Sequence, residues 1–153
     1  MGTAMFYHLT RHPLEQTLAM LLDKAGQAGW RVLVRGTEFS RMDWLDQQLW
    51  LTPADGFLPH GLAGGAHDAQ QPVLLSAGTE PAANGADCVM IVDGAPVTPD
   101  EVNALARVCV LFDGNDPAAV DTARGQWKAL KDAGVTAQYW SEESGRWEKK
   151  AET

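Results

Sequence analysis

Hydrophobic positions along the chain follow two alternating spacings. Where apolar residues recur every three or four positions they predict amphipathic helices. One such stretch places Leu14, Leu18, Leu21, Leu22 and Ala25 on a single face, and a second does the same for Met42, Leu45 and Leu49. Short, nearly continuous apolar runs have the length of buried strands instead. Those runs are Met5–Leu9, Arg31–Arg35, Pro72–Ser76, Cys88–Val92, Arg107–Phe112 and Val135–Trp140.

Helix start and stop signals flank the periodic stretches. Thr98–Glu101 combines a capping residue, a proline at the first helical position and a glutamate two residues later. Ser40–Asp43 resembles a capping box in which aspartate replaces the usual glutamate. Pro13 suits the start of the first helix, Asp116-Pro117 opens the last long one, and Gly134 closes it.

Strands that alternate with helices predict one Rossmann-like, three-layer α/β domain. Its sheet should be mostly parallel, with helices on both faces. No internal repeat or linker divides residues 1–153, and about 141–153 reads as a polar C-terminal tail. Gly61–Gln71 is small and polar, which predicts a loop.

Composition and charge exclude several classes of function. A formal charge of −8 over 153 residues disfavours direct nucleic-acid binding, because phosphates would be repelled by most of the surface. The apolar runs are too short to span a bilayer, and residues 1–10 do not resemble a signal peptide. Cys88 and Cys109 lie in strand-like runs, as buried reduced thiols would. We therefore expect a cytoplasmic protein without a membrane segment.

Two Asp-Gly pairs are the candidates for enzyme chemistry. Asp93-Gly94 and Asp113-Gly114 follow predicted strands, where open α/β sheets often bind ligands, so a metal or phosphate could bind between them. Asp-Gly also simply favours a turn. No glycine-rich phosphate loop is present, so we expect no nucleotide or other cofactor.

The last predicted helix carries a cationic stripe, by which we mean Arg124, Trp127, Lys128 and Lys131. Spacings of three, four and seven residues from Arg124 place these side chains within about 100° of arc. This combination suits a receptor for an acidic peptide with an aromatic end. Arginine can form two parallel hydrogen bonds to a carboxylate, and tryptophan can line an apolar pocket. A solvated face whose cations complement the helix C-terminus would show the same spacing.

A second unusual stretch is Asp46–Gly61. Trp50, Leu51, Phe57 and Leu58 sit in or beside irregular backbone, around a turn at Asp55-Gly56. Loops normally lie at the surface. Such side chains are therefore either folded back onto the domain or offered to another protein.

Taken together, the segments resemble the chi subunit family of the bacterial DNA polymerase III holoenzyme. The matching stretches, in family order, are FYHL, LDQQLW, GFLPHG, NGAD, VDGA, LFDG, ARGQWKALKDAG and QYW. The resemblance implies a Rossmann-like protein without catalytic activity. It implies an accessory protein of the clamp loader, which bridges the psi subunit and the acidic C-terminal tail of single-stranded DNA-binding protein.

The resemblance also implies two binding sites. Psi would contact Trp50 and Phe57, with Leu58, Pro59 and His60 adjoining. In bacteria without psi, another chi-binding protein such as a helicase would take this place. The tail would bind Arg124, Trp127 and Lys128. Enteric members have tyrosine at the position of Trp127 and a basic residue at that of Val120. Either Lys131 supplies the missing charge, or the tail binds this chain more weakly. The alternative function is a small nucleotide- or metal-dependent enzyme that uses Asp93 and Asp113.

Overall fold

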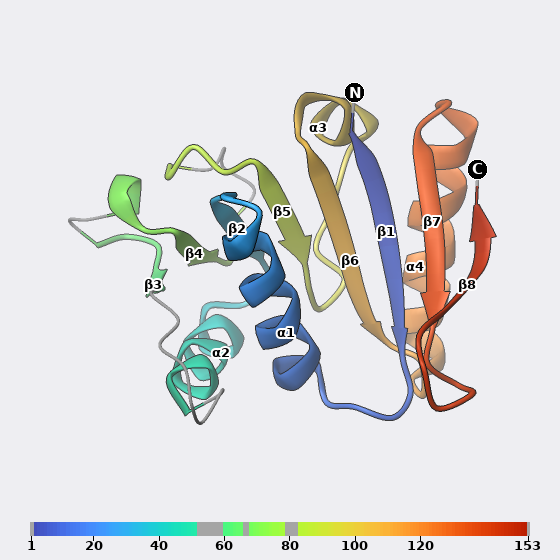
Figure 1. Cartoon of the computed structure of the whole chain (residues 1–153), viewed down its shortest axis with the longest axis horizontal. Helices are drawn as coiled ribbons and strands as arrows, with labels where there is room; N and C mark the ends of the chain where they lie inside the picture. The colour runs from blue at the N-terminus through green and yellow to red at the C-terminus, as the bar shows by residue number, and fades with distance from the viewer. Residues whose placement is uncertain (1, 52–59, 66–67, 79–82, 153) are drawn as a thin grey trace.

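The computed structural model describes residues 2–51, 60–65, 68–78 and 83–152. Within these ranges the strands form a single sheet of eight, in the order β3-β4-β2-β5-β6-β1-β7-β8 (Figure 1). The strands are β1 (Thr3–Leu9), β2 (Val32–Arg35), β3 (Gly61–Leu62), β4 (Val73–Ser76), β5 (Cys88–Ile91), β6 (Arg107–Asp113), β7 (Thr136–Ser141) and β8 (Glu148–Glu152). The helices are α1 (Leu14–Gln27), α2 (Phe39–Leu51), the 3₁₀ helix η1 (Asp68–Gln70), α3 (Pro99–Ala104) and α4 (Pro117–Asp132).

The sheet is parallel from β3 to β7, and only β8 runs antiparallel. Third from the β8 edge, β1 lies between β6 and β7, with Phe6 opposite Val110 on one side and Tyr139 on the other. Strands buried on both faces explain the continuous apolar runs of the sequence. The predicted fold class, an α/β domain with a mostly parallel sheet, is confirmed.

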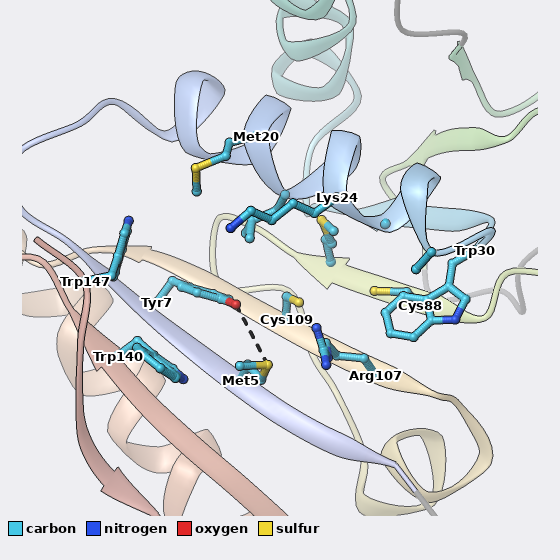
Figure 2. Close-up of a pocket in the computed structure, with 14 residues that line it drawn as sticks. Met5, Tyr7, Met20, Lys24, Trp30, Cys88, Arg107, Cys109, Trp140 and Trp147 are labelled. Carbon is cyan, nitrogen blue, oxygen red and sulfur yellow. Dashed lines mark hydrogen bonds between the residues drawn. The ribbon is translucent and has the colours of Figure 1, made fainter.

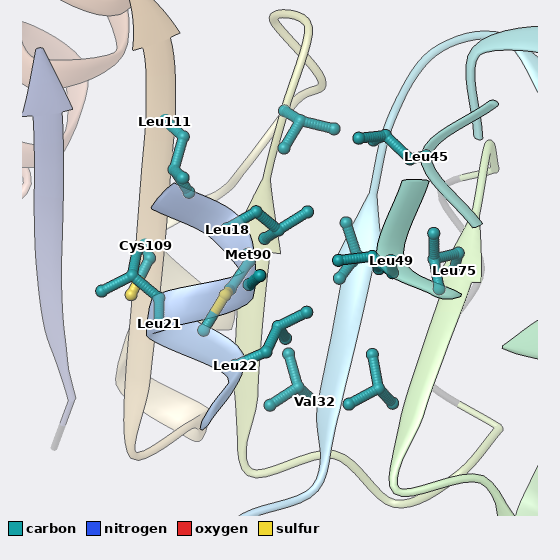
Figure 3. Packing of buried hydrophobic residues seen from close by; sticks show 14 of the residues in the cluster. Leu18, Leu21, Leu22, Val32, Leu45, Leu49, Leu75, Met90, Cys109 and Leu111 are labelled. Atoms are coloured by element: carbon teal, nitrogen blue, oxygen red, sulfur yellow. The ribbon is translucent and has the colours of Figure 1, made fainter. Parts of the chain in front are cut away.

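Helices cover both faces of this sheet. On one face, α1 and α2 bury their leucines against side chains of β2, β4, β5 and β6 (Figure 3). On the other face, Val102 of α3 and Ala123 and Leu130 of α4 pack with Phe6, Val110 and neighbouring strand residues. The helical stripes predicted for α1 and α2 are the buried ones, except that Leu14 is only partly buried.

Of the five predicted helix signals, three are confirmed, at Thr98, Asp116 and Gly134. Pro13 lies at the start of α1, but as its N-cap, because the first helical residue is Leu14. Thr98 and Glu101 form the capping box of α3, and the Asp116 side chain accepts a hydrogen bond from the Ala118 backbone N–H. The capping box predicted at Ser40 is wrong. Helix α2 already begins at Phe39, and the Met42 N–H bonds to the carbonyl of Glu38. Ser40 therefore lies inside the first turn.

Two segments predicted without regular structure contain some. Within the polar tail, Glu148–Glu152 forms β8 and pairs with β7. Within Gly61–Gln71, β3 pairs with β4, and η1 follows. Both cysteines are buried free thiols, as expected. In the described ranges no helix is long and apolar enough to cross a membrane.

Candidate functional site

Helix α4 lies beside β7 (Figure 1), and the cationic stripe belongs to this helix. Ala123 and Leu130 hold the helix against the sheet, because they are buried seven residues apart on one face. Trp127 is half-buried next to them, whereas Arg124, Lys128 and Lys131 are exposed. The structure thus brings all four predicted residues to one helix surface, with the aromatic side chain between the core and the cations.

Trp127 belongs to an aromatic cluster that sequence reasoning did not find. Its ring meets Phe6 edge-on at 5.4 Å and Tyr139 at 5.9 Å between centroids. The Tyr139 hydroxyl lies 2.7 Å from Nδ1 of His8. Tyr139 shares the α4 face of β7 with buried Ala137, so the alternation along β7 was the available signal. Tyr139 and His8 therefore extend the predicted site along the sheet.

The cations of the stripe differ in their electrostatic surroundings. Lys128 Nζ lies 2.7 Å from a carboxylate oxygen of Asp132, and this bond raises the pKa of Lys128. Arg124 and Lys131 form no ion pair with any described residue. Burial raises the pKa of Tyr139, while the charge of Arg124 opposes this shift. Arg124 is thus an uncompensated cation next to an aromatic wall.

The other predicted surface lies at the end of α2. We call Trp50, Leu51 and the underlying His60 the Trp50 surface. Trp50 is 50% exposed and Leu51 73%. The His60 ring stacks on Trp50 at 4.2 Å between centroids, and its Nε2 lies 2.9 Å from the Asp46 carbonyl oxygen. His60 is itself buried, so it supports Trp50 rather than facing solvent.

Asp46 gives this surface an acidic margin. Burial and the nearby charge of Asp43 raise the pKa of Asp46, and His60 and a hydrogen bond from Trp50 oppose the shift. Phe39, at the start of α2, is 65% exposed and was not predicted. Phe57, Leu58 and Pro59 lie outside the described residues.

The two aspartates of the enzyme hypothesis line one cavity of about 450 Å³ at the strand ends. Asp93 is bonded to Arg41, with 3.1 Å between Oδ2 and Nε, and has a φ of 55°. Asp113 Oδ1 accepts a hydrogen bond from the Asn115 backbone N–H. Each carboxylate thus has a structural partner in or near a turn. In the part of the chain that is described, no cluster of three potential metal ligands occurs.

Comparisons with known proteins agree on one family. Residues 1–138 match the family described as DNA polymerase III chi subunit, HolC. The chain is 29% identical to DNA polymerase III subunit chi of Pseudomonas aeruginosa over 123 aligned residues. The alignment covers 80% of this chain and 82% of that protein. The similarity to the family extends from β1 into β7, and so includes α2 and α4.

Proposed function

Because this chain belongs to the DNA polymerase III chi subunit family, an accessory and not a catalytic family of the replisome, we propose that it is a non-enzymatic adaptor. One partner is the acidic C-terminal tail of single-stranded DNA-binding protein. The other is the psi subunit of the clamp loader, or another chi-binding protein such as a helicase. The adaptor works in the cytoplasm and does not itself contact DNA.

The observation that carries this proposal is the separation of two exposed aromatic surfaces. The Trp50 surface belongs to α2, which packs on the same face of the sheet as α1. The cationic stripe belongs to α4, which packs on the opposite face and over the other half of the sheet. Two partners can therefore bind at the same time without competing for one area, as a bridging protein requires.

The chemistry of the cationic stripe suits an acidic tail with an aromatic end. Arg124 can form a charge-assisted, bidentate bond with a carboxylate. Trp127 and Tyr139 contact each other edge to face, at 5.9 Å between ring centroids, and together offer partly exposed aromatic area to an aromatic side chain. A few cations near the peptide act within one Debye length of about 10 Å, while the more distant acidic groups of the protein are screened.

The Trp50 surface suits a different kind of partner. Large apolar side chains are exposed there beside Asp43 and Asp46, so an apolar segment with basic neighbours would be complementary. Phe57, Leu58 and Pro59 follow α2 in sequence and would add apolar area. His60 would contribute indirectly, by holding the Trp50 ring in place.

A two-variant capture experiment tests the proposal. Tagged wild type, Trp50→Ala and Arg124→Ala are exposed to lysate of the native organism, and bound proteins are identified. Arg124→Ala should lose single-stranded DNA-binding protein and keep the second partner, and Trp50→Ala should do the reverse. Loss of both partners in either variant, with an unchanged melting temperature, would contradict two independent surfaces.

A further inference from the structure

One half of the sheet lacks a helix on the face that α1 and α2 cover. These helices pack over β2, β4, β5 and β6, whereas in the described chain none covers β1, β7 and β8 on that side. The reason is topological, since β7 is followed by a hairpin to β8 instead of a helix. Met5, Tyr7 and Trp140 on that side of β1 and β7 are therefore only partly buried.

A cavity of about 440 Å³ fills the space between this bare half-face and α1 (Figure 2). Three tryptophans from separate parts of the chain wall it, namely Trp30 before β2, Trp140 on β7 and Trp147 in the hairpin. The Trp147 ring meets Tyr7 edge-on at 5.4 Å. The volume lies in the range of small-molecule sites, which are mostly apolar with a few polar groups.

Three donor groups that line the cavity, those of Tyr7, Lys24 and Arg107, have no oxygen acceptor among the described residues. Lys24 and Arg107 both line it, and neither has an anionic partner among the described residues. The Arg107 Nε is buried and has no hydrogen bond to a described residue, although its guanidinium lies over the Trp30 ring, 5.1 Å from the ring centroid. Among the described residues, the Tyr7 hydroxyl reaches only the Met5 sulfur, a weak acceptor, at 3.8 Å.

We propose that this cavity binds a small organic acid with an aromatic or aliphatic body. The body would lie among the three tryptophans, and the carboxylate would accept hydrogen bonds from Arg107 and Tyr7 and be attracted by Lys24. A stable protein partner would need about 800 Å² of complementary surface. A cavity of about 440 Å³ that is lined by two cations is matched better by a single small ligand. This site is independent of both surfaces assigned to the adaptor function.

The test uses 1-naphthaleneacetate and its neutral amide as probes of matched shape. The chain has six tryptophans, of which three line the cavity, so the indole N–H signals in protein-observed NMR report the location of binding. The acid should bind saturably and shift the signals of Trp30, Trp140 and Trp147, but not those of Trp44 and Trp50. The Trp127 signal reports the cationic stripe, where an aromatic acid can bind separately, so the titration is repeated with Arg124→Ala, which should leave the three cavity shifts unchanged. The amide should bind about tenfold more weakly, because a charge-assisted bond is lost.

Charge variants complete the design. Lys24→Gln and Arg107→Gln should each lower the affinity for the acid severalfold and leave the affinity for the amide unchanged. Lys24 is exposed on α1, so its variant should fold even if Arg107→Gln does not. Lys150→Gln removes the same charge from exposed β8 and should have no effect.

Three results would overturn the proposal: equal binding of acid and amide, signal shifts confined to Trp44, Trp50 and Trp127, or no saturation of the cavity signals up to about 10 mM. Binding weaker than about 10 mM lies below that of almost all specific sites. Concentration-dependent shifts of the three cavity signals without probe would also overturn it, because a second copy would then cover the cavity.

Discussion

At the scale of single residues, Glu142 shows how one buried carboxylate organises the ends of two neighbouring strands, β1 and β7. It follows β7 and accepts hydrogen bonds from the backbone N–H groups of Thr10 and His12. It also bonds to the His12 ring. Burial alone would raise the pKa of Glu142, but these bonds outweigh it and the pKa is lowered. The residue thus ties the end of β1 to the end of β7.

Replacement of this carboxylate should make stability depend on pH in a defined way. Glu142→Gln should lower the free energy of unfolding by roughly 1–3 kcal/mol near neutral pH, because charged hydrogen bonds are lost. Since the folded-state pKa is depressed, the advantage of wild type is present above the ordinary value of 4.5 and is lost as pH falls through the folded-state pKa. Urea unfolding of both proteins at about pH 7 and about pH 3 measures this. A gap that is equal at both pH values would refute the assignment.

Trp127 has two roles that must be separated in experiments. It packs on Phe6 and Tyr139, and it also forms the aromatic part of the proposed tail site. Trp127→Ala should therefore cost about 2 kcal/mol or more of stability in addition to peptide affinity, as truncation of large aromatics does. Arg124 is exposed and makes no ion pair with a described residue, so it reports binding alone.

At the scale of elements, α4 contains a carboxylate that competes with an acidic peptide for Lys128. Asp132 neutralises Lys128 through an exposed pair four residues apart. An acidic ligand must displace this carboxylate or bind beside it.

Removal of the competitor should strengthen the proposed tail binding. Asp132→Asn should raise the affinity for an acidic tail peptide roughly two- to fivefold, because exposed pairs of this kind are worth about 0.2–1 kcal/mol. Fluorescence anisotropy of a labelled peptide at low and moderate salt would measure the change. Asp121→Asn, on the same helix but without an ion pair to a described residue, is the matched control for charge. An equal gain in both variants would mean that only net charge matters.

The elements themselves were largely predictable from the sequence, and the exceptions have physical reasons. Six strands and the helices α1 to α4 follow from apolar spacing and from end signals such as Thr98 and Gly134, which has a φ of +78°. Strands β3 and β8 were missed because both lie at the edges of the sheet and carry small or polar residues. Such strands are defined only by their backbone hydrogen bonds to a neighbour. Their sequences therefore lack the apolar pattern from which a strand can be predicted.

The site was predictable only in so far as it lies on one helix. Helical spacing by itself places Arg124, Trp127, Lys128 and Lys131 on one surface of α4. Tyr139 and His8 join them only through the order of β1 and β7 in the sheet. The cavity between α1 and β7 likewise depends on which half of the sheet lacks a helix, and local sequence does not encode this.

At the scale of the whole molecule, a charge of −8 coexists with a local cationic stripe. The overall field should keep nucleic acids away, while short-range cations on α4 still attract an acidic peptide. We expect no appreciable binding of bare single-stranded DNA or of nucleotides near physiological salt. Anisotropy with a labelled oligonucleotide and thermal shift with nucleotides and Mg²⁺ would measure this. Saturable micromolar binding of either ligand would favour the enzyme alternative or a direct role on DNA.

The central claim is that α4 receives the acidic tail of single-stranded DNA-binding protein, and peptide titration tests it most directly. A labelled peptide of that tail is titrated against wild type, Arg124→Ala and the charge-matched control Lys150→Ala. Wild type and Lys150→Ala should bind alike. Arg124→Ala should lose roughly ten- to a hundredfold in affinity, because one charge-assisted and partly bidentate contact is removed. If all three proteins bind equally, or none binds even at low salt, the cationic stripe is only a solvated helix face and the account is wrong.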